Sequence, residues 1–319
     1  MQGTEVGPWI HQRLSEHVVG QRAVVEQIIA CVGARAHVLL EGPPGVAKTL
    51  VASEVAHALG LGFNRVQMTP DLMPSDLLGT SVWLPNEGRF EFRPGPVFTQ
   101  VLLADEINRA PPKTQAALLQ AMQEHRVTLD GVEHELGEDF WVIATQNPLD
   151  QEGTYPLPES QLDRFALKVS VGFPQSPDEL EVLRRHQAGG DALERRLSVE
   201  RRQLDRESLR AFQKAVRAVH VSEPVLAYIH ETVRLTREQS ELTHGAGPRA
   251  ALSLLDVCRS LALVRGRSYL IPDDVRDLYV ACVGHRVKLA PEAMVTGVDV
   301  AEVLERILRG VPVPEVQSA

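Results

Sequence analysis

The stretch Glu41–Leu50, EGPPGVAKTL, decides how this 319-residue chain is interpreted. An apolar run that ends at Leu40 leads into it, and a helical pattern begins at Lys48. Two glycines and two prolines between them predict one tight loop that joins a buried strand to a helix. In such a loop, consecutive backbone N–H groups face one concavity, together with the positive end of the helix dipole. The stretch therefore predicts a phosphate-binding loop.

The side chains of this loop fit the phosphate-binding pattern G-x-x-x-x-G-K-[ST] with one departure. In that pattern, Lys48 reaches the outer phosphates and the Thr49 hydroxyl binds Mg²⁺. Ala47 stands where the second glycine is expected. Alanine suits helical dihedral angles there and does not suit a positive φ. The simpler alternative is a tight strand-to-helix turn with a solvated lysine.

Two more apolar runs end in polar side chains. Val101–Ala104 is followed by Asp105 and Glu106, and Trp141–Thr145 is followed two residues later by Asn147. Ligands of open α/β sheets bind at the carboxyl ends of the strands. There, one carboxylate can hold Mg²⁺ through water, the next can accept a proton from attacking water, and an amide can orient that water. Exposed acids and an Asn-Pro turn are the simpler alternatives, but together the three strand ends predict one site.

Apolar strands separated by helices predict an α/β fold with a parallel sheet covered on both faces. Residues 1 to about 30 look helical with a break at Val18–Gln21, and further helices are expected from Lys48 and over Pro111–Glu124. The predicted strands are Ala36–Leu40, Phe63–Met68, Val101–Ala104, Trp141–Thr145 and Leu167–Val171.

Two hairpins and one boundary complete the expected organisation. Asp130-Gly131 between two short strand patterns is a tight-turn signal, and Pro85–Gly88 predicts a second hairpin. Around Gly172–Pro177 the α/β pattern ends, and Ser176 and Pro177 suit the start of a helix. We therefore predict a core at residues 1–174 and a mostly helical domain at 175–319, where no strand pattern is convincing.

Composition narrows the classes of partner and compartment. The formal net charge of −9 argues mildly against nucleic acid as the main partner. Cys31, Cys258 and Cys282 show no metal-ligand spacing and are predicted to be buried thiols in a reducing cytoplasm. No apolar run is long enough for a membrane span, and no signal peptide is evident. His125 and His134 lie near the second hairpin without evident partners, so we expect them to be solvated.

Five stretches carry a resemblance to a known family: HVLLEGPPGVAKT (37–49), QMTPDLMPSDLLG (67–79), FRPGPVFTQVLLADEINRAPPKTQAALLQAMQEHRVTLDG (92–131), WVIATQNPLDQEGTYPLPESQLDRF (141–165) and GAGPRAALSLL (245–255). In these stretches the chain resembles the MoxR family of AAA+ ATPases. The resemblance implies a P-loop NTPase core with an αβα arrangement, a parallel sheet and hairpin inserts, followed by a smaller all-α lid domain. The ending Ala-Lys-Thr recurs in that family.

The resemblance implies ATP and Mg²⁺ as cofactors and a role for each matching residue. Lys48 and Thr49 are the phosphate-loop pair, Asp105 is the Mg²⁺ acid, Glu106 the general base and Asn147 the first sensor. The residues expected to bind the nucleotide are Val19, Gly20, Gly42, Pro43, Pro44, Gly45, Val46, Ala47, Lys48, Thr49 and Leu50, and the expected metal ligands are Thr49 and Asp105.

Two arginines match positions that act on the transition state. Arg164 corresponds to the arginine finger that reaches the ATP of a neighbouring copy, and Arg249 to the second sensor on the lid. A guanidinium can neutralise charge on the phosphate oxygens with forked hydrogen bonds. The simpler alternatives are a surface ion pair of Arg164 with Asp163 or Glu159, and an unliganded helix-start cation for Arg249. Arg109 is an alternative candidate for the arginine that acts at the interface between copies.

The work done by the ATPase is less evident from the residues. The resemblance implies a homohexameric, cytoplasmic, chaperone-like remodeller that matures partner proteins or inserts cofactors, often with a von Willebrand A domain partner. The hairpins are the expected contact surface, and Gln67 is expected to hold Glu106 away from water when substrate is absent. A nucleic-acid motor is the first alternative, although neither hairpin is basic. A nucleotide-switched scaffold with little turnover is the second.

Overall fold

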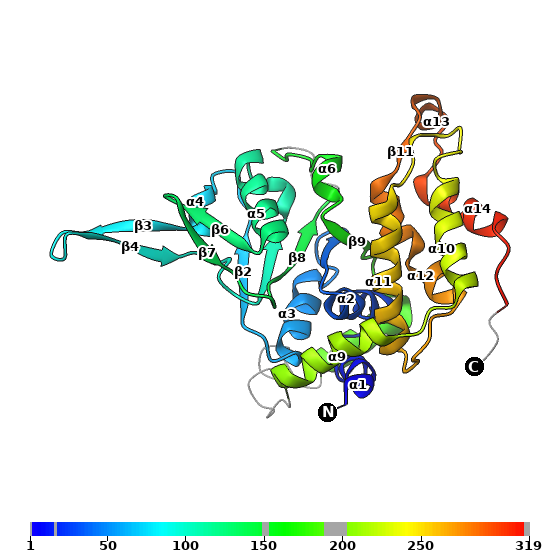
Figure 1. Ribbon diagram of the computed structural model, residues 1–319, viewed down its shortest axis with the longest axis horizontal. Helices are drawn as coiled ribbons and strands as arrows, with labels where there is room; N and C mark the ends of the chain where they lie inside the picture. The colour runs from blue at the N-terminus through cyan, green and yellow to red at the C-terminus, as the bar shows by residue number, and fades with distance from the viewer. Residues whose placement is uncertain (1, 16–17, 149–152, 188–202, 316–319) are drawn as a thin grey trace.

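The computed structural model describes residues 2–15, 18–148, 153–187 and 203–315, and shows a sheet-based core beside a helical part (Figure 1). The elements before residue 175 are α1 (Gly3–Ser15), α2 (Arg22–Gly33), β1 (His37–Glu41), α3 (Lys48–Ala58), β2 (Phe63–Gln67), α4 (Pro74–Leu78), β3 (Gly79–Leu84), β4 (Arg89–Pro94), β5 (Val101–Asp105), η1 (Ile107–Arg109), α5 (Pro112–Glu124), β6 (Arg126–Leu129), β7 (Val132–Glu135), β8 (Trp141–Gln146), α6 (Glu159–Leu162) and β9 (Phe165–Ser170). The later elements are α7 (Ser176–Gln187), α9 (Arg206–Ala218), α10 (Glu223–Leu235), β10 (Leu242–His244), α11 (Pro248–Val264), α12 (Pro272–Val283), η2 (Gly284–Arg286), β11 (Lys288–Leu289), α13 (Pro291–Val295) and α14 (Val300–Gly310). Residues 203–315 are called the lid below.

Five parallel strands form the central sheet in the order β2-β5-β8-β1-β9. All five strands predicted from the sequence are present, and the register places Val38 of β1 beside Ile143 of β8 and Leu167 of β9. Because crossovers between parallel strands bring helices to both faces, β5 and most of β1 and β8 are continuous buried runs. The prediction of an α/β fold with a parallel sheet is confirmed.

Alternate residues of the central strands enter two separate hydrophobic cores. Val38 and Leu40 belong to the core that includes α1 and α2, whereas Leu39 belongs to the core that includes α5. This alternation follows from the two-residue period of a strand, and each fully buried leucine stabilises the fold by roughly 1.5–3 kcal/mol. The first core continues into α9–α12 of the lid, so apolar packing joins the lid to one face of the sheet.

The two predicted hairpins are present, and the longer one projects from the core. β3 and β4 pair over Gly79–Pro94 and extend away from the sheet, while β6 and β7 form the shorter hairpin beside them (Figure 1). The rings of Trp83 and Phe90 lie 5.0 Å apart on the projecting hairpin, and both side chains are exposed.

The expectation of solvated histidines near the second hairpin is wrong for both residues. The His134 ring of β7 stacks on Phe92 of β4 with 3.8 Å between centroids, which ties the two hairpins together. His125 ends α5 with a positive φ of 51°, and its ring lies edge-on to Phe140. Aromatic packing between elements far apart in sequence therefore uses both rings.

The lid is helical, as predicted, with one addition. The short strands β10 and β11 form an antiparallel pair, which sequence patterning did not indicate because the strands are three and two residues long. α11 packs along α2, and α9 packs against α1 (Figure 1). The N-terminal helices are therefore enclosed between the sheet and the lid.

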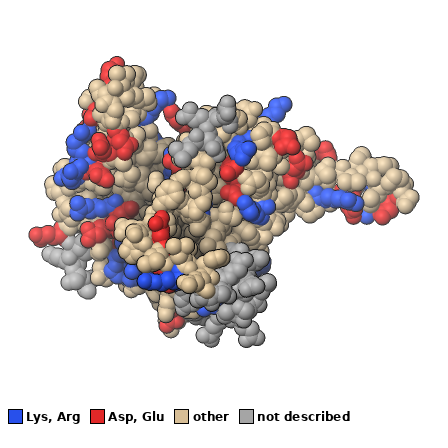
Figure 2. Space-filling view, turned by 180° about the vertical axis from the view of Figure 1, so that it is seen from behind, with Lys and Arg blue, Asp and Glu red and all other residues tan. Residues whose placement is uncertain are grey.

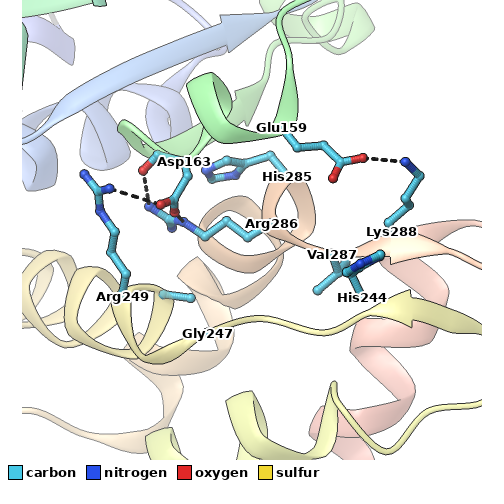
Figure 3. A pocket seen from close by; sticks show the side chains of 10 residues that line it. Glu159, Asp163, His244, Gly247, Arg249, His285, Arg286, Val287 and Lys288 are labelled. Carbon is cyan, nitrogen blue, oxygen red and sulfur yellow. Dashed lines mark hydrogen bonds and ion pairs between the residues drawn. The ribbon is translucent and has the colours of Figure 1, made fainter. Parts of the chain in front are cut away.

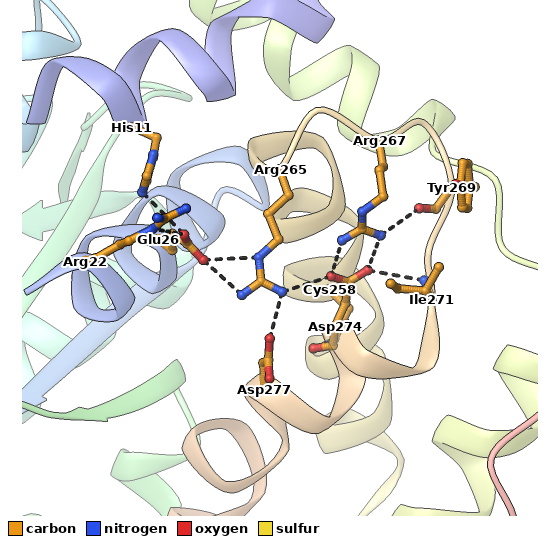
Figure 4. Close-up of polar contacts among 10 residues, drawn as sticks. All are labelled: His11, Arg22, Glu26, Cys258, Arg265, Arg267, Tyr269, Ile271, Asp274 and Asp277. Carbon is orange, nitrogen blue, oxygen red and sulfur yellow. Dashed lines mark hydrogen bonds and ion pairs between the residues drawn. The ribbon is translucent and has the colours of Figure 1, made fainter. Parts of the chain in front are cut away.

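A polar network reinforces this contact between α2 and the lid (Figure 4). Arg265, which directly follows α11, donates to Glu26 of α2 at 2.9 Å and to Asp277 of α12 at 2.7 Å. Asp274, which is fully buried, accepts from Arg265 and from Arg267. Buried charges are tolerated when they are paired in this way, and removal of one partner is strongly destabilising. The network thus links α2 to the lid through paired charges.

The cysteines are buried and unpaired, as predicted. Burial raises the pKa of the Cys282 thiol to about 11 and raises those of Cys31 and Cys258 as well. Thiols with raised pKa values are poor nucleophiles, which agrees with a packing role. Across the residues that the structure describes, no helix has the length and apolar character needed to cross a bilayer.

Candidate functional site

The loop between β1 and α3 has the shape that the sequence predicts. Gly45 has a φ of +84°, and a Cβ there would meet no atom within 4 Å, so this glycine is required by its backbone conformation rather than by space. At Gly42 the reason is different, because a Cβ would collide with the carbonyl oxygen of Val171. The first glycine lets β9 run close to the loop, and the second turns the chain back toward α3.

Ala47 is the one residue of the loop whose conformation contradicts an expectation. It has φ 63° and ψ 21°, in the left-handed region, although alanine was expected there only with helical dihedral angles. For a residue with a Cβ this conformation costs roughly 1–2 kcal/mol. Such strain is held where the surrounding structure fixes the backbone, and it concentrates at functional sites.

Lys48 extends over the loop rather than into solvent. Its ammonium donates to the carbonyl oxygens of Gly42 and Pro43, the second at 2.8 Å. Burial lowers the pKa of Lys48, and the nearby carboxylates of Asp105, Glu106 and Glu41 oppose that change. The ammonium therefore lies in the concavity of the loop, between the loop carbonyls and the acids at the strand ends. A solvated lysine on an ordinary turn does not describe this position.

Asp105, at the end of β5, is buried and saturated with donors. Its Oδ2 accepts from the Thr49 hydroxyl at 3.2 Å and from Arg65 Nη2 at 2.6 Å. Its Oδ1 accepts from the Thr145 hydroxyl at 2.6 Å. Thr49 and Asp105, predicted to share a metal ion, are thus brought within hydrogen-bond distance of each other. Arg65 and Thr145 were not predicted from the sequence.

Glu106, the expected general base, is held by two donors. Its Oε2 accepts from Gln67 Nε2 and from Arg109 Nη1, each at 3.0 Å. Its backbone has a φ of 58°, and its N–H donates to Thr145 Oγ1 at 2.8 Å. The structure thus brings Gln67 onto Glu106, as expected, and places Arg109 beside the same carboxylate.

Arg65 joins these two acids through β2. Arg65 Nη2 donates to Asp105 and, at 3.3 Å, to Gln67 Oε1, while Gln67 donates to Glu106. The two residues lie on one face of β2 because strand side chains alternate. The sequence signal that could have found them is this i, i+2 pair of polar residues in a predicted strand beside the strand of Asp105.

Asn147 and the Val19-Gly20 segment both lie next to the loop. Asn147 is buried and follows Gln146, whose carbonyl oxygen accepts from Gly42 N–H at 3.2 Å. Gly20 has a φ of +73° and lies against residues 174–178, and the next side chain, Gln21, donates to the Gly172 carbonyl at 2.9 Å. Both segments are therefore positioned at the edge of the sheet where the loop begins.

The two predicted arginines lie apart from the loop. Arg164, between α6 and β9, donates to the Leu119 carbonyl of α5 at 2.9 Å and also to Gln123. Arg249, at the start of α11, pairs with Asp163 at 3.2 Å. In the described part of the chain, none of the hydrogen bonds or ion pairs found for either arginine leads to Lys48 or the two acids. The alternative pairing of Arg164 with Asp163 is not seen among the described contacts.

The donor set fits a nucleotide with Mg²⁺. A hydroxyl and a carboxylate oxygen are the ligand types that Mg²⁺ prefers, and Thr49 and Asp105 present them side by side. The loop offers free space above Gly45 and the α3 N-terminus, where phosphate binds favourably. Lys48 and Arg65 supply positive charge around the same space.

Comparison with known proteins defines the class. Residues 37–167 match the model of the ATPase family associated with various cellular activities (AAA), and residues 234–307 match the AAA lid domain. The chain is therefore an AAA ATPase with its lid. A crystal structure from Cytophaga hutchinsonii superposes with a TM-score of 0.83 at 35% identity and covers 98% of each chain.

Two full-length relatives narrow the class further. The chain is 39% identical over 310 residues to Chaperone MoxR1 of Mycobacterium tuberculosis, covering 94% of this chain and 80% of that protein. It is 39% identical over 310 residues to YeaC of Bacillus subtilis, covering 97% of this chain and 95% of that protein. The chain belongs to the MoxR family.

Proposed function

We propose that the protein hydrolyses ATP with Mg²⁺, as an assembly of identical copies, and uses the energy to remodel partner proteins. One observation carries the hydrolytic part of this proposal. Lys48, Thr49, Asp105 and Glu106 come from two separate strand ends, and the fold gathers them at one edge of the sheet, with Thr49 Oγ1 at 3.2 Å from Asp105 Oδ2. This is the edge at which α/β sheets bind ligands.

The residues of this edge divide the work between binding and proton transfer. The loop N–H groups and Lys48 bind the phosphates, and Thr49 and Asp105 hold Mg²⁺, which when bound neutralises charge on the phosphate oxygens. Glu106 accepts the proton of the attacking water. In the described structure Gln67 and Arg109 both donate to Oε2 of this carboxylate, so Oε1 is the oxygen assigned to this step. Asn147 orients the water from the next strand end.

The nucleotide base binds beside Val19 and Gly20. Their segment lies against residues 172–178, where the chain leaves the sheet, and Val171 lies next to Gly42 of the loop. A ligand that spans from the loop to this segment would touch Gly42, Pro43, Pro44, Gly45, Val46, Ala47, Lys48, Thr49 and Leu50. The base would then lie near the domain boundary that we propose between residues 174 and 175.

The position of Arg164 supports the proposed assembly. It is anchored on α5, and its described contacts do not reach the loop of its own chain. An arginine finger supplied by a neighbouring copy raises turnover by roughly 10³–10⁵ in related nucleotide hydrolases. We therefore propose a ring, with six copies as in AAA+ relatives, in which Arg164 completes the next site. Arg249, on the lid, is proposed as the second sensor.

The remodelling role rests on the family and on the projecting hairpin. MoxR1 is named a chaperone. The β3–β4 hairpin carries exposed aromatic rings at Trp83 and Phe90, which suit a protein contact. Glu87, Arg89, Glu91 and Arg93 alternate in sign along its sequence, and both signs occur on the face drawn in Figure 2, so it lacks the basic track that nucleic acid requires. A protein client, a von Willebrand A domain partner and a cytoplasmic location complete the proposal.

The test compares Glu106→Gln with Glu305→Gln, an exposed acid of α14 that serves as the matched control. Glu106→Gln should lower ATP turnover by roughly 10²–10⁴-fold, because general-base catalysis contributes about that much, and leave ATP binding within a few-fold. Glu305→Gln should change neither. A wild-type rate no higher than that of Glu106→Gln would support a nucleotide-switched scaffold instead. The Glu106→Gln form with ATP is also the reagent for capturing a client.

A further inference from the structure

Arg286 of η2 contacts the chain segment that carries Arg164. It is a lid residue, and its side chain is only 4% exposed. We propose that Arg286 is a positioning residue that holds the backbone on both sides of Arg164 and thereby sets where this arginine stands. The inference rests on the proposed role of Arg164 in a neighbouring site, and it assigns a role to a residue that contacts neither the loop nor the acids in the described structure.

The contacts of Arg286 bracket Arg164. Its Nη2 donates to the Phe165 carbonyl at 2.9 Å and to the Asp163 carbonyl at 3.4 Å, and its Nη1 donates to the Ala166 carbonyl at 3.2 Å. Its Nε donates to the Asp163 carboxylate at 2.7 Å. One guanidinium thus binds the residue before Arg164 and the two residues after it. Figure 3 shows the contact of Arg286 with the Asp163 carboxylate. The planar fork of five N–H donors allows this, and a lysine could not reproduce it.

Arg286 also donates hydrogen bonds to other residues of the lid. Nη1 also donates to the Cys282 carbonyl at 2.6 Å, and Nη2 to the Ser253 hydroxyl at 3.3 Å. The neighbouring side chain, His285, is also buried, and its Nε2 donates to the same Phe165 carbonyl at 3.0 Å. Burial lowers the pKa of His285 to about 3, so its ring is neutral and Nε2 carries the proton. Two consecutive lid residues therefore bind backbone carbonyl groups at the start of β9.

Arg164 contacts the core through its side chain, and its backbone N–H also donates to the Gln161 carbonyl at 3.2 Å. Its guanidinium is held by Leu119 and Gln123 on α5, which belongs to the core. The carbonyl groups of its two neighbours, Asp163 and Phe165, accept hydrogen bonds from Arg286, which belongs to the lid. A displacement of the lid would move this backbone relative to α5 and pull the guanidinium off its partners. The lid of one copy would then control the site of the next.

Two nearby ion pairs between core and lid are weaker and serve as comparisons. Lys288 of β11 pairs with Glu159 of α6 at 2.8 Å, with both side chains at least half exposed. Arg249 shares Asp163 with Arg286, but it is 59% exposed and makes this one described ion pair. All four side chains line the cavity drawn in Figure 3. Arg286 and its contacts with residues 163–166 are called the clamp below. Exposed ion pairs contribute little to stability, so Lys288→Ala is a matched control that removes a core–lid pair without changing the clamp.

The experiment measures binding and turnover of Arg286→Ala, Arg164→Ala and Lys288→Ala, each alone and mixed with Lys48→Ala. Arg286→Ala alone should bind a fluorescent ATP analogue within threefold of wild type and lose at least tenfold in kcat. In mixed rings, the intact loop of an Arg286→Ala copy should lie beside the correctly placed Arg164 of a Lys48→Ala copy. Such a site has both parts that turnover needs, so activity should rise above that of either variant alone. Mixing Arg286→Ala with Arg164→Ala should give no gain, because both lack a placed finger. Lys288→Ala should match wild type.

The outcomes separate the clamp from the proposed function. If Lys48→Ala rescues Arg164→Ala but not Arg286→Ala, the clamp is refuted and the proposed finger survives. If neither is rescued, the neighbouring-site role of Arg164 fails, and the inference fails with it. Loss of analogue binding in Arg286→Ala would point to a purely structural role and would also refute it.

Arg286→Lys keeps the test usable if the alanine variant does not fold. It retains the charge beside Asp163 but loses the forked contacts to the three carbonyls, so it should show the same pattern: normal binding, reduced kcat and rescue by Lys48→Ala. Thermal unfolding of each variant shows whether the fold is retained. Wild-type turnover in a folded Arg286→Lys protein would overturn the inference.

Discussion

The edge of the sheet that carries Lys48 and Glu106, called the loop edge, and the clamp around Arg286 both contain charged groups. The two regions differ in the partners that these groups have. At the loop edge, Lys48 binds backbone carbonyls of its own loop, and Glu106 is shared between two donors. Around Arg286, one guanidinium is buried and each of its nitrogens has a described partner. The first region holds contacts that a ligand can replace, and the second holds contacts that keep two parts of the chain in register.

Backbone conformation shows the same difference. At the loop edge, Ala47 and Glu106 both have a positive φ, an arrangement that persists only where surrounding structure enforces it. Residues 163–166 at the clamp are absent from the positive-φ residues of the described chain. Of these two regions, only the loop edge contains non-glycine residues with a positive φ, although Arg35, His125 and Asp130 have one elsewhere in the described chain. Each prediction below tests whether the two regions are functionally separate in this way.

The largest expected effect comes from Lys48→Ala compared with Arg249→Ala. Lys48→Ala removes charged hydrogen bonds to phosphate and should weaken ATP binding by roughly 10²-fold or more, since such bonds contribute about 1.5–3 kcal/mol each. Arg249 contacts Asp163 rather than the loop, so Arg249→Ala should change binding by less than about threefold and act mainly on turnover. Titration of a fluorescent ATP analogue measures both.

Equal losses of binding in the two variants would break the comparison, because Arg249 would then belong to the nucleotide site of its own chain. Arg237→Ala, which replaces another lid arginine, is a control for the general effect of removing a positive charge. Its binding curve should overlay that of the wild-type protein.

The next effect concerns the pH dependence of stability and arises in β1, directly before the loop. His37 is buried, its Nε2 donates to the Met122 carbonyl and its Nδ1 accepts from Val142 N–H. Burial lowers its pKa from 6.5 to about 4. The ring is neutral in the folded chain and protonates more readily when unfolded, so its contribution is complete above pH 6.5 and is lost as pH falls toward 4. The loss amounts to about 3 kcal/mol.

Urea unfolding at several pH values between 7 and 4 measures this loss. His37→Gln should have lower stability at pH 7 and a shallower decline below pH 6.5, because the titrating group is gone. His230→Gln, at an exposed site of α10, serves as the control and should keep the wild-type slope. An unchanged slope in His37→Gln would show that other groups cause the acid sensitivity.

The loop edge was predictable from sequence because its signals are local. A strand, a glycine-rich loop and a helix start lie within Ala36–Leu50, and apolar runs that end in acids or amides identify the neighbouring strand ends. Parallel topology then brings these ends together without further information. Hence Lys48, Thr49, Asp105 and Asn147 could be named in advance, and the structure places them at one edge.

The clamp could not be predicted because its partners are distant in sequence. Arg286 and Asp163 are separated by 123 positions, and no periodicity links the two elements that carry them. The same holds for His134 and Phe92, whose stacking depends on how two hairpins lean on each other. The positive φ of Ala47 was missed for a different reason, since side-chain type constrains dihedral angles only statistically. The predicted domain boundary at residues 174–175 stays a prediction.

A smaller effect is expected for the Mg²⁺ requirement in Arg65→Ala. Arg65 binds Asp105 Oδ2, the same oxygen that faces Thr49, so its guanidinium competes with a metal ion for this carboxylate. Arg65 is half exposed, and its ion pair should contribute no more than about 1 kcal/mol, which corresponds to an approximately fivefold change. ATP-analogue binding at increasing Mg²⁺ should reach half saturation at a lower Mg²⁺ concentration in the variant.

Arg89→Ala, on the projecting hairpin, is the matched control because its ion pair with Glu87 is also exposed but distant from the acids. A higher Mg²⁺ requirement in Arg65→Ala would mean that Arg65 supports the metal site rather than competing for it. In that case the contacts at the loop edge would be as permanent as those of the clamp.

The smallest expected effect is on stability in Ala47→Gly. Glycine removes the penalty of roughly 1–2 kcal/mol for a left-handed alanine, but it also increases the entropy of the unfolded chain, which costs about 0.4–1 kcal/mol. The variant should therefore be more stable by about 0.5–1 kcal/mol and should keep ATP turnover, because glycine is the residue of the strict loop pattern. Urea unfolding without nucleotide measures the difference. A loss of stability would show that the Ala47 methyl group packs favourably and that the loop is not strained there.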